Sequence, residues 1–297
     1  MRILNLDGRL QVLVDDRAVD VETASHGHFG SDSQAVYARW AEFVEWAGGL
    51  AIDGQGTPVG ARVIGSPVPE PRQVFAVGLN YQEHADESGF VKPEQPVIFT
   101  KFPSSISGPH TVVELPAGSV DWEVELVVVI GIGGRCIPEH QGWAHVAGVT
   151  VGQDLSERQR QHSGPAPQFC LAKSHRGFSP LGPALVTVDE LDDPDDLEIG
   201  ATINGETVQH GRTSQFIFPV PDLIHRLSEV VELYPGDLIF TGTPSGVGAG
   251  RKPPRFLQTG DVLRSYISGV GELRQTFVDP DSDGSADDAT AGLSVSR

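Results

Sequence analysis

The sequence is poor in cysteine, methionine and aromatic residues, and it has no long apolar run. Its 297 residues include 2 cysteines, 1 methionine and 7% aromatic residues. Cys136 and Cys170 are too few for a disulfide framework and form no Cys-x-x-Cys pair, so we expect packing residues. No stretch approaches the roughly 18 consecutive apolar residues of a membrane helix. Residues 1–13 lack both the basic flank and the cleavage site of a signal peptide, so we expect a cytoplasmic protein without a membrane partner.

Basic residues are also scarce. Lys and Arg number 21 against 40 Asp and Glu, which gives a net charge of −19. A protein this acidic is not expected to bind the phosphate backbone of a nucleic acid. Seven of the acids lie in residues 189–198, where nothing spaces them as metal ligands, and we interpret this segment as a solvated loop. Five Asp residues lie in residues 279–297, which we interpret as a loose polar tail.

Glycine and proline, 35 and 22 residues, are spread along the chain and favour short strands joined by turns over a helical bundle. Apolar runs predict buried strands, and between them only residues 221–231 have the spacing of a good helix. The fold class predicted is therefore α+β and β-rich, without the regular strand-helix alternation of a doubly wound fold or a TIM barrel. The predicted strands are residues 74–78, 97–100, 126–130, 149–152, 184–188, 199–203, 238–241 and 262–267.

A small N-terminal α+β domain is expected over residues 1–69. After two short strands, apolar residues recur at helical spacing between Val36 and Ala47, with Ser33 as the candidate N-cap. The proline-rich residues 65–72 favour extended backbone, so we interpret them as a linker to a larger domain over residues 70–278.

The most informative segment is VDWEVELVVVI, residues 120–130. Alternate residues of a strand share a face, so Asp121, Glu123 and Glu125 are expected in one row. Because the strand continues into an apolar run, its end is expected to be buried, and unpaired buried carboxylates are costly. Either Arg and Lys partners or a divalent metal must face the row. Without His or Cys in it, such an ion would be hard: Mg²⁺, Mn²⁺ or Ca²⁺.

A third ligand for such an ion is available where the next predicted strand ends. Asp154 follows the apolar run 149–152, although an aspartate in this position is more often a helix cap or a turn residue. Arg158 and Gln161 come soon after it. Arg158 could bind a carboxylate with two hydrogen bonds, and Gln161 could hydrogen-bond a carbonyl or a hydroxyl.

Two further segments carry candidate catalytic groups. His84 and Glu87 are three residues apart, on the same side of a helical turn, and a His oriented by a carboxylate is a typical general base. A surface pair is the alternative interpretation. Lys173 lies between apolar residues and a turn, where a partly desolvated ammonium could meet an oxyanion. Its alternative is a surface lysine that extends its ammonium into water.

The glycine-rich residues 235–250 do not form a phosphate loop. They lack the Gly-Lys-Ser/Thr motif, and no G-x-S-x-G motif of a serine hydrolase is present. Thr241 and Thr243, with neighbouring backbone N–H groups, could instead bind a carboxylate or an oxyanion.

Taken together, these segments closely resemble the fumarylacetoacetate hydrolase family, in the family's order over about residues 74–277. The N-terminal part resembles the small domain of many bacterial members. The segments that carry the resemblance are VGLNYQEHADE, VIFTKFPSSISGP, VDWEVELVVVIG, GVTVGQDLSERQRQ, AKSHRGFSPLGP, INGETVQHGRTSQFIF, LYPGDLIFTGTPSGVG and LQTGDVLRSYISGVGEL.

The resemblance implies a mixed β-sandwich roll, usually a homodimer, with a Mg²⁺ or Mn²⁺ ion in each site. It also implies a lid that orders over bound substrate. Lys101 falls in a matching motif without an assigned role. By resemblance, the metal ligands are Glu123, Glu125 and Asp154, the lid dyad is His84 and Glu87, the catalytic lysine is Lys173, and the substrate-site candidates are Arg158, Gln161, Thr243 and Tyr81.

The residues and the resemblance agree on one hypothesis for the reaction. A keto-acid substrate of the acylpyruvate or fumarylpyruvate type would be hydrolysed at a C–C bond, through an enolate that the metal stabilises. Alternatives on the same site are decarboxylation or isomerisation of oxaloacetate or 2-hydroxymuconate-type diacids. The His-x-x-Glu dyad favours hydrolysis, because a decarboxylase needs no activated water. A non-catalytic protein that binds a metal or a dicarboxylate is the third alternative.

Overall fold

The computed structural model describes residues 1–14, 17–50, 56–87, 89 and 91–280, and strands dominate it. The α-helices are α1 (Val21–Ala24), α2 (Trp40–Gly48), α3 (Gln82–Glu87), α4 (Arg158–Gln161), α5 (Phe169–Ala172) and α6 (Val220–Val230), and short 3₁₀ helices lie at Ala35–Arg39, Pro103–Ser105, Glu139–His145, Val188–Glu190 and Thr213–Gln215. The strands are β1 (Arg2–Leu6), β2 (Arg9–Val14), β3 (Arg17–Asp20), β4 (Thr57–Pro58), β5 (Ile64–Gly65), β6 (Val74–Gly78), β7 (Val97–Thr100), β8 (Ile106–Ser107), β9 (His110–Glu114), β10 (Val120–Asp121), β11 (Val124–Ile130), β12 (Val146–Gln153), β13 (Ser156–Glu157), β14 (Ser179–Val186), β15 (Glu198–Ile203), β16 (Glu206–Arg212), β17 (Leu238–Phe240), β18 (Val262–Ile267) and β19 (Gly271–Val278).

These strands form two large sheets and a short ribbon. The larger sheet has the order β4-β3-β2-β1-β14-β12-β11-β17-β6-β7, with β5 beside β1 and β8 beside β14. The second sheet has the order β16-β15-β18-β19-β9, and β10 pairs with β13. Apolar side chains of β11, β12, β15 and β18 belong to one buried cluster, so the two sheets pack against each other. The prediction of a β-rich α+β fold is confirmed.

Most predicted elements are present, some with different bounds. β6, β7 and β18 have the predicted bounds, and α6 is shifted by one residue from the predicted helix. The expected N-cap was wrong: α2 begins only at Trp40, after the 3₁₀ helix Ala35–Arg39, and the Ser33 hydroxyl is buried without a hydrogen-bond partner. None of the helices in the described part of the chain is both long and apolar enough to cross a membrane.

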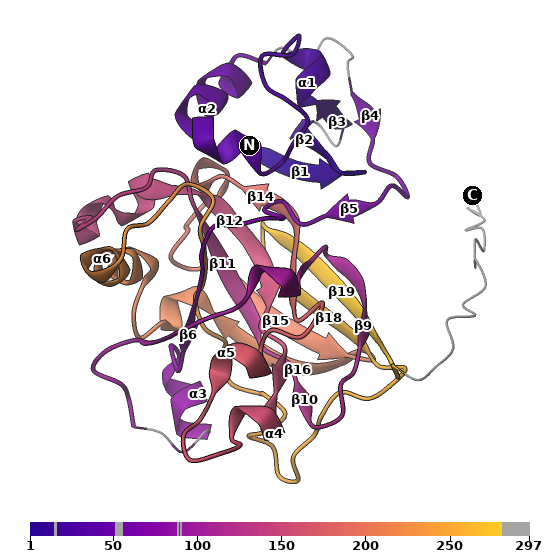
Figure 1. The fold of residues 1–297 in the computed structure, drawn as a ribbon, viewed down its shortest axis with the longest axis vertical. Helices are drawn as coiled ribbons and strands as arrows, with labels where there is room; N and C mark the ends of the chain where they lie inside the picture. The colour runs from indigo at the N-terminus through magenta and orange to yellow at the C-terminus, as the bar shows by residue number, and fades with distance from the viewer. Residues whose placement is uncertain (15–16, 51–55, 88, 90, 281–297) are drawn as a thin grey trace.

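The N-terminal unit, residues 1–69, is joined to the larger sheet. β1 pairs antiparallel with β14, Ile3 lying opposite Leu185, so the N-terminal strands extend that sheet (Figure 1). The division into domains at residue 69 stays a prediction. The acidic residues 189–198 connect β14 to β15, and most of their carboxylates are exposed. The expected tail lies mainly in residues 281–297, outside the described residues.

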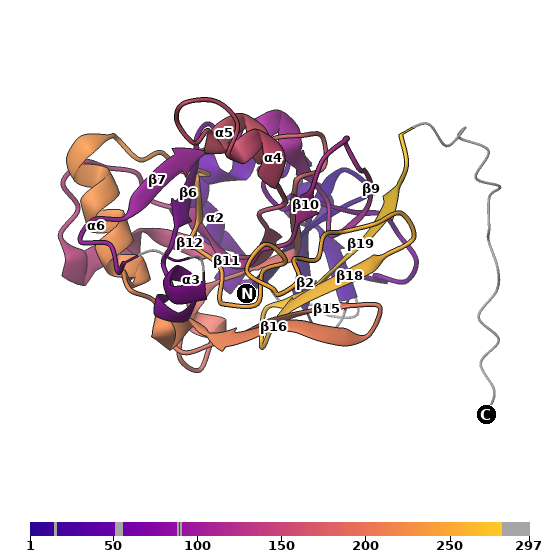
Figure 2. The ribbon, with the colours of Figure 1, turned by 90° about the horizontal axis from the view of Figure 1, so that it is seen from below.

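The antiparallel pair β11–β12 brings together residues about 30 positions apart. In this register Val124 lies opposite Gln153 and Glu125 lies opposite Gly152, so the start of β11 adjoins the end of β12. Figure 2 shows α4 and α5 above these strands and α3 below them. The candidate site is at this end of the sheet.

Candidate metal and substrate site

Three carboxylates meet where β11 begins and β12 ends. Glu123 precedes β11, Glu125 is its second residue, and Asp154 follows β12; one oxygen from each lies within 4.8 Å of the others. All three are buried, with exposed fractions of 5%, 1% and 0%. A cluster of carboxylate oxygens is the donor set of a hard divalent cation, so these residues could hold one.

Asp121 does not join this cluster, contrary to the predicted row of three. The regular strand is interrupted between Asp121 and Val124, and the Glu123 N–H donates to the side chain of Gln153 at 2.8 Å instead of to a neighbouring backbone. The Asp121 carboxylate is directed to Arg158 and to the backbone of residues 248 and 249. The period-two alternation therefore holds only from Glu123 onward.

The Arg and Lys partners that were one alternative for the carboxylate row are present, whereas the divalent metal stays a prediction. Lys173 Nζ donates to Glu123 at 2.7 Å and to Asp154 at 2.6 Å. Arg158 donates to Glu123 at 2.6 Å. Lys101 Nζ donates to the other oxygen of Asp154 at 2.6 Å and to the backbone carbonyl of Lys173. Lys173 is 3% exposed, so the interpretation as a surface lysine was wrong.

The two glutamates differ in their electrostatic surroundings. Burial alone would raise the pKa of Glu123, but the positive charges of Lys173 and Arg158 outweigh it and lower the pKa. Burial, followed by the negative charges of Asp154 and Glu123, raises the pKa of Glu125 well above its ordinary value. Within the described residues Glu125 has no ion pair, and its hydrogen-bond donor is the Gly242 N–H at 2.8 Å. A divalent ion would supply the missing positive charge, so the residues fit such an ion.

The glycine-rich loop binds a carboxylate of the chain itself. The Gly242 N–H donates to the carboxylate of Glu125, whereas binding of a substrate carboxylate or oxyanion by Thr241, Thr243 and nearby N–H groups stays a prediction. The hydroxyls of both threonines donate to carbonyls of β11, at 2.8 Å for Thr241 and 2.9 Å for Thr243. These hydrogen bonds hold the glycine-rich loop against β11, the strand that contains Glu125.

His84 and Glu87 form the predicted contact. Both lie on α3, and His84 Nδ1 is 2.8 Å from a Glu87 oxygen. The same carboxylate accepts the Gly246 N–H at 2.9 Å, which docks α3 on the glycine-rich loop. With Nδ1 bonded to Glu87, Nε2 is the ring nitrogen that can exchange a proton with a substrate or a water.

A cavity of about 530 Å³ contains these groups. Its polar lining includes the predicted residues His84, Glu87, Glu123, Glu125, Arg158, Gln161, Lys173 and Thr243. Asp154 is not among the described lining residues, but it accepts a hydrogen bond at 2.6 Å from Lys173, which is. The apolar lining is Val77, Leu79, Val97, Phe99, Pro167, Phe169 and Val247.

Tyr81 does not line this cavity within the described residues. Its ring is 2% exposed and packs edge-on against Phe216, with 4.9 Å between the ring centroids. Its hydroxyl is buried without a hydrogen-bond partner, and burial raises the pKa of Tyr81. Its role in substrate binding stays a prediction.

The sequence did not reveal three residues of the site. Lys101 contacts Asp154, His162 lines the cavity, and Gln209 binds both the Val124 N–H and the Thr243 hydroxyl. Lys101 had two sequence signals, its place directly after a predicted strand and its matching motif, but neither assigned it a role. Gln209 lies in β16, which has no apolar pattern that marks it as a core strand.

The geometry can now be compared with known proteins. Residues 73–278 match the family described as fumarylacetoacetate (FAA) hydrolase C-terminal. The chain belongs to the fumarylacetoacetate hydrolase family. The mitochondrial oxaloacetate tautomerase FAHD2A of Homo sapiens is 49% identical over 210 residues, which is 70% of this chain and 67% of that protein.

Two solved structures of the fumarylacetoacetate hydrolase family are similar over most of the chain. A putative HpcE protein from Mycobacterium smegmatis has 67% identity and a TM-score of 0.91, covering 95% of this chain and 100% of that one. Maleylpyruvate hydrolase from Sphingobium sp. SYK-6, solved with manganese(II) and pyruvate, has 29% identity and a TM-score of 0.78, covering 94% and 99%. The chain is thus a fumarylacetoacetate hydrolase family enzyme with an acidic cluster that could bind a divalent metal.

Proposed function

We propose that this enzyme hydrolyses a C–C bond in an acylpyruvate-type substrate, with Mg²⁺ or Mn²⁺ held by Glu123, Glu125 and Asp154. Ca²⁺ is the third candidate ion, because it too prefers oxygen ligands. The observation that supports hydrolysis is that the His84–Glu87 dyad lines the same cavity as Glu123 and Glu125, two of the three clustered carboxylates. A bound divalent ion would supply the positive charge that stabilises an enolate.

Each side chain has a separate role in this proposal. His84 takes a proton from water, and Glu87 orients the imidazole through Nδ1. The resulting hydroxide attacks the carbonyl farther from the substrate carboxylate. The C–C bond then breaks, and the acyl group leaves as a carboxylic acid. The electron pair of the broken bond forms the pyruvate enolate, which takes up the proton held by His84 to give pyruvate. Lys173 donates a hydrogen bond to the oxyanion, and Arg158 with Gln161 binds the substrate carboxylate.

The cavity wall supports a substrate with an uncharged tail. Among the described lining residues, the permanent cations are Arg158 and Lys173, and both contact Glu123. The rest of the wall includes Phe99 and Phe169, whose rings lie 5.4 Å apart in an edge-on contact. An apolar acyl group would be buried there, whereas a second carboxylate would find only His84 and His162.

Oxaloacetate tautomerisation is the second candidate, favoured by the 49% identity to the human tautomerase. It needs no activated water, and His84 would move a proton between carbon and oxygen. Isomerisation or decarboxylation of related diacids would use the same groups. A protein that binds a metal or a dicarboxylate without turnover is the remaining alternative.

One experiment separates these candidates. The metal-stripped enzyme receives Mg²⁺ or Mn²⁺ and then an acylpyruvate, fumarylpyruvate or oxaloacetate, while enol absorbance and pyruvate are measured together. Hydrolysis of an acylpyruvate releases pyruvate as the enol absorbance falls. Loss of the enol absorbance of oxaloacetate without release of pyruvate identifies a tautomerase. A metal-dependent heat of ligand binding without formation of any product identifies a binding protein.

His84→Ala tests the dyad in the same assay. We expect turnover to fall by about a hundredfold or more while metal binding is unchanged. His140→Ala, at an exposed histidine that does not line the cavity, is the control. Full activity of His84→Ala would contradict the role of the dyad.

The homodimer, the absence of a nucleic-acid partner and the cytoplasmic location stay predictions. Light scattering of the purified protein would measure the oligomeric state.

A further inference from the structure

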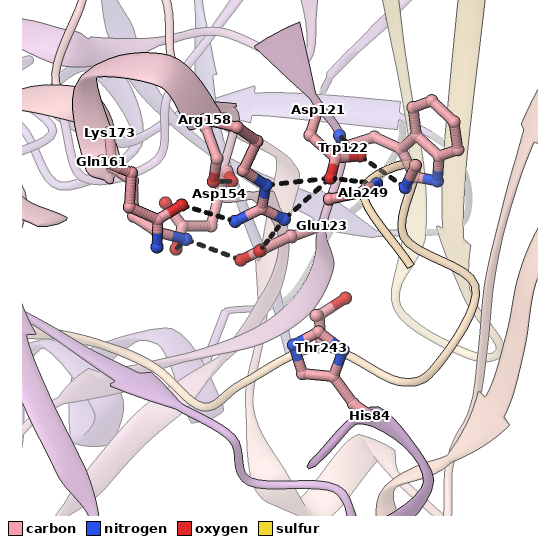
Figure 3. Close-up of polar contacts among 12 residues, drawn as sticks. His84, Asp121, Trp122, Glu123, Asp154, Arg158, Gln161, Lys173, Thr243 and Ala249 are labelled. Carbon is pink, nitrogen blue, oxygen red and sulfur yellow. Dashed lines mark hydrogen bonds and ion pairs between the residues drawn. The ribbon is translucent and has the colours of Figure 1, made fainter. Parts of the chain in front are cut away.

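Asp121 is the one carboxylate of the 121–125 segment that the proposed reaction does not use. It is 0% exposed, and both oxygens accept hydrogen bonds from two donors each. Oδ1 accepts the backbone N–H of Trp122 at 2.8 Å and of Gly248 at 2.6 Å. Oδ2 accepts the Ala249 N–H at 3.0 Å and Arg158 Nε at 2.9 Å (Figure 3). Asp121 thus joins its own segment to two others.

The first of these segments carries Arg158. Asp121 Oδ2 accepts from Nε and lies 2.9 Å from Nη2, which itself donates to Glu123 at 2.6 Å. The guanidinium is planar and rigid, so fixing this edge also fixes the direction of Nη1. Nη1 donates to Gln161 at 2.9 Å, beside the cavity. Asp121 therefore sets how Arg158 faces a substrate.

The second segment is the loop 246–249, on which α3 docks. Trp122 Nε1 donates to the Gly246 carbonyl at 3.2 Å, and the Gly246 N–H donates to Glu87 at 2.9 Å. The loop lies so close to Asp121 that a Cβ on Gly248 would be 2.8 Å from its Oδ1. Glu87 in turn holds His84, so the loop that Asp121 fixes is also the support of the dyad.

We propose that Asp121 is a positioning residue that couples the orientation of Arg158 to the docking of α3 on loop 246–249. Its negative charge makes all four hydrogen bonds charge-assisted, which strengthens each of them. When Asp121 is intact, the substrate-binding guanidinium and the His84–Glu87 dyad are held through one carboxylate.

Asp121→Asn is the first test, because every partner of Asp121 is a donor. Either orientation of the amide places its NH₂ group against two N–H donors, so at least two of the four bonds are lost. Asp237→Asn is the matched control. Asp237 is also 0% exposed and accepts from the Gln73 N–H, Gln73 Nε2 and the Tyr234 N–H, outside the cavity lining.

Three readouts on the full-length protein separate positioning from general destabilisation. Hydrogen exchange of the metal-loaded protein should accelerate at least fivefold in residues 246–249 and 82–87 for Asp121→Asn, and in neither for Asp237→Asn. The KM for the oxo acid should rise at least tenfold. The dissociation constant for Mn²⁺, measured by calorimetry, should change less than threefold, because Asp121 is not a ligand.

The kinetic readout rests on the proposed function, whereas hydrogen exchange and Mn²⁺ binding do not. Failure to find any substrate would therefore leave the coupling testable by exchange alone. Unchanged exchange in residues 82–87, or equal effects of Asp121→Asn and Asp237→Asn, would overturn the proposal.

Trp122→Phe is the second variant, for use if Asp121→Asn does not fold. It removes the hydrogen bond from Nε1 to the Gly246 carbonyl and part of a fully buried ring system, and it keeps an aromatic side chain. We expect faster exchange in residues 246–249 and 82–87 with unchanged Mn²⁺ affinity. If exchange in residues 82–87 stays at the wild-type rate, loop and helix are not coupled.

Discussion

Glu125→Gln should stabilise the metal-free protein and destabilise the metal-loaded one. Glu125 is 1% exposed, has no ion pair in the described structure, and has a pKa raised first by burial and then by Asp154 and Glu123. The metal-free wild type therefore loses stability as the pH rises from the ordinary glutamate pKa toward the higher folded pKa. Glutamine keeps an oxygen for the Gly242 N–H and carries no charge.

The two effects have opposite signs, and the effect of the metal is the larger. Removing the unpaired buried charge should raise the free energy of unfolding in EDTA by about 1–2 kcal/mol. Saturating the wild type with Mn²⁺ at about 1,000 times its dissociation constant should add about 4.1 kcal/mol, which the variant should not gain. At about 2–4 °C per kcal/mol, both changes are measurable by thermal unfolding.

Glu123→Gln is the control, two residues away on the same segment. It breaks the ion pairs with Lys173 and Arg158. It should therefore destabilise the metal-free protein by about 3–5 kcal/mol. The reasoning is refuted if Glu125→Gln melts below the wild type in EDTA, or if Mn²⁺ raises its melting temperature as much as that of the wild type.

Three further predictions concern the metal, the tail pocket and the sheet. Affinity for Mn²⁺ should rise with pH above the ordinary range of a glutamate pKa, because the raised pKa of Glu125 makes a proton compete with the ion; calorimetry that shows no pH dependence would contradict this. Phe169→Ala should raise KM about tenfold for a long-chain acylpyruvate and little for acetylpyruvate, so equal effects in steady-state kinetics would exclude Phe169 from the tail pocket. Gly152→Ala should lower the free energy of unfolding by about 1–3 kcal/mol in denaturant titrations, while Gly30→Ala changes little. A Cβ on Gly152 would lie 2.4 Å from Val127, whereas none lies within 4 Å at Gly30.

The cluster of three carboxylates could be predicted from the sequence because its residues obey a local rule. Glu123 and Glu125 are two residues apart at the start of an apolar strand, and Asp154 ends another. The same rule failed for Asp121, because the side chain of Gln153 binds the Glu123 N–H and interrupts the pleat. That interruption depends on a residue 30 positions away, which no local pattern contains.

The strands β16 and β19 were not predicted from the sequence, for a different reason. β19 points Leu273, Gln275 and Phe277 inward, and the buried Gln275 interrupts the apolar alternation that would reveal a strand. In β16 the buried pair is Val208 and Gln209, again with a polar member. Both glutamines donate to backbone carbonyls that belong to distant segments, Pro109 for Gln275 and Pro244 for Gln209. Buried polar residues of this kind are recognisable only once their partners are placed.

β11, the strand that carries Glu125, has two further residues on the same face that the N-terminal unit covers. Val127 and Val129 share a face with Glu125 by alternation, and they are buried with Ile3, Trp40 and other N-terminal residues. At the end of β11, a Cβ on Gly131 would lie 2.7 Å from the Trp40 ring. Deleting residues 1–69 would therefore expose this apolar face of β11 to water. The N-terminal side chains that cover this surface therefore also support β11.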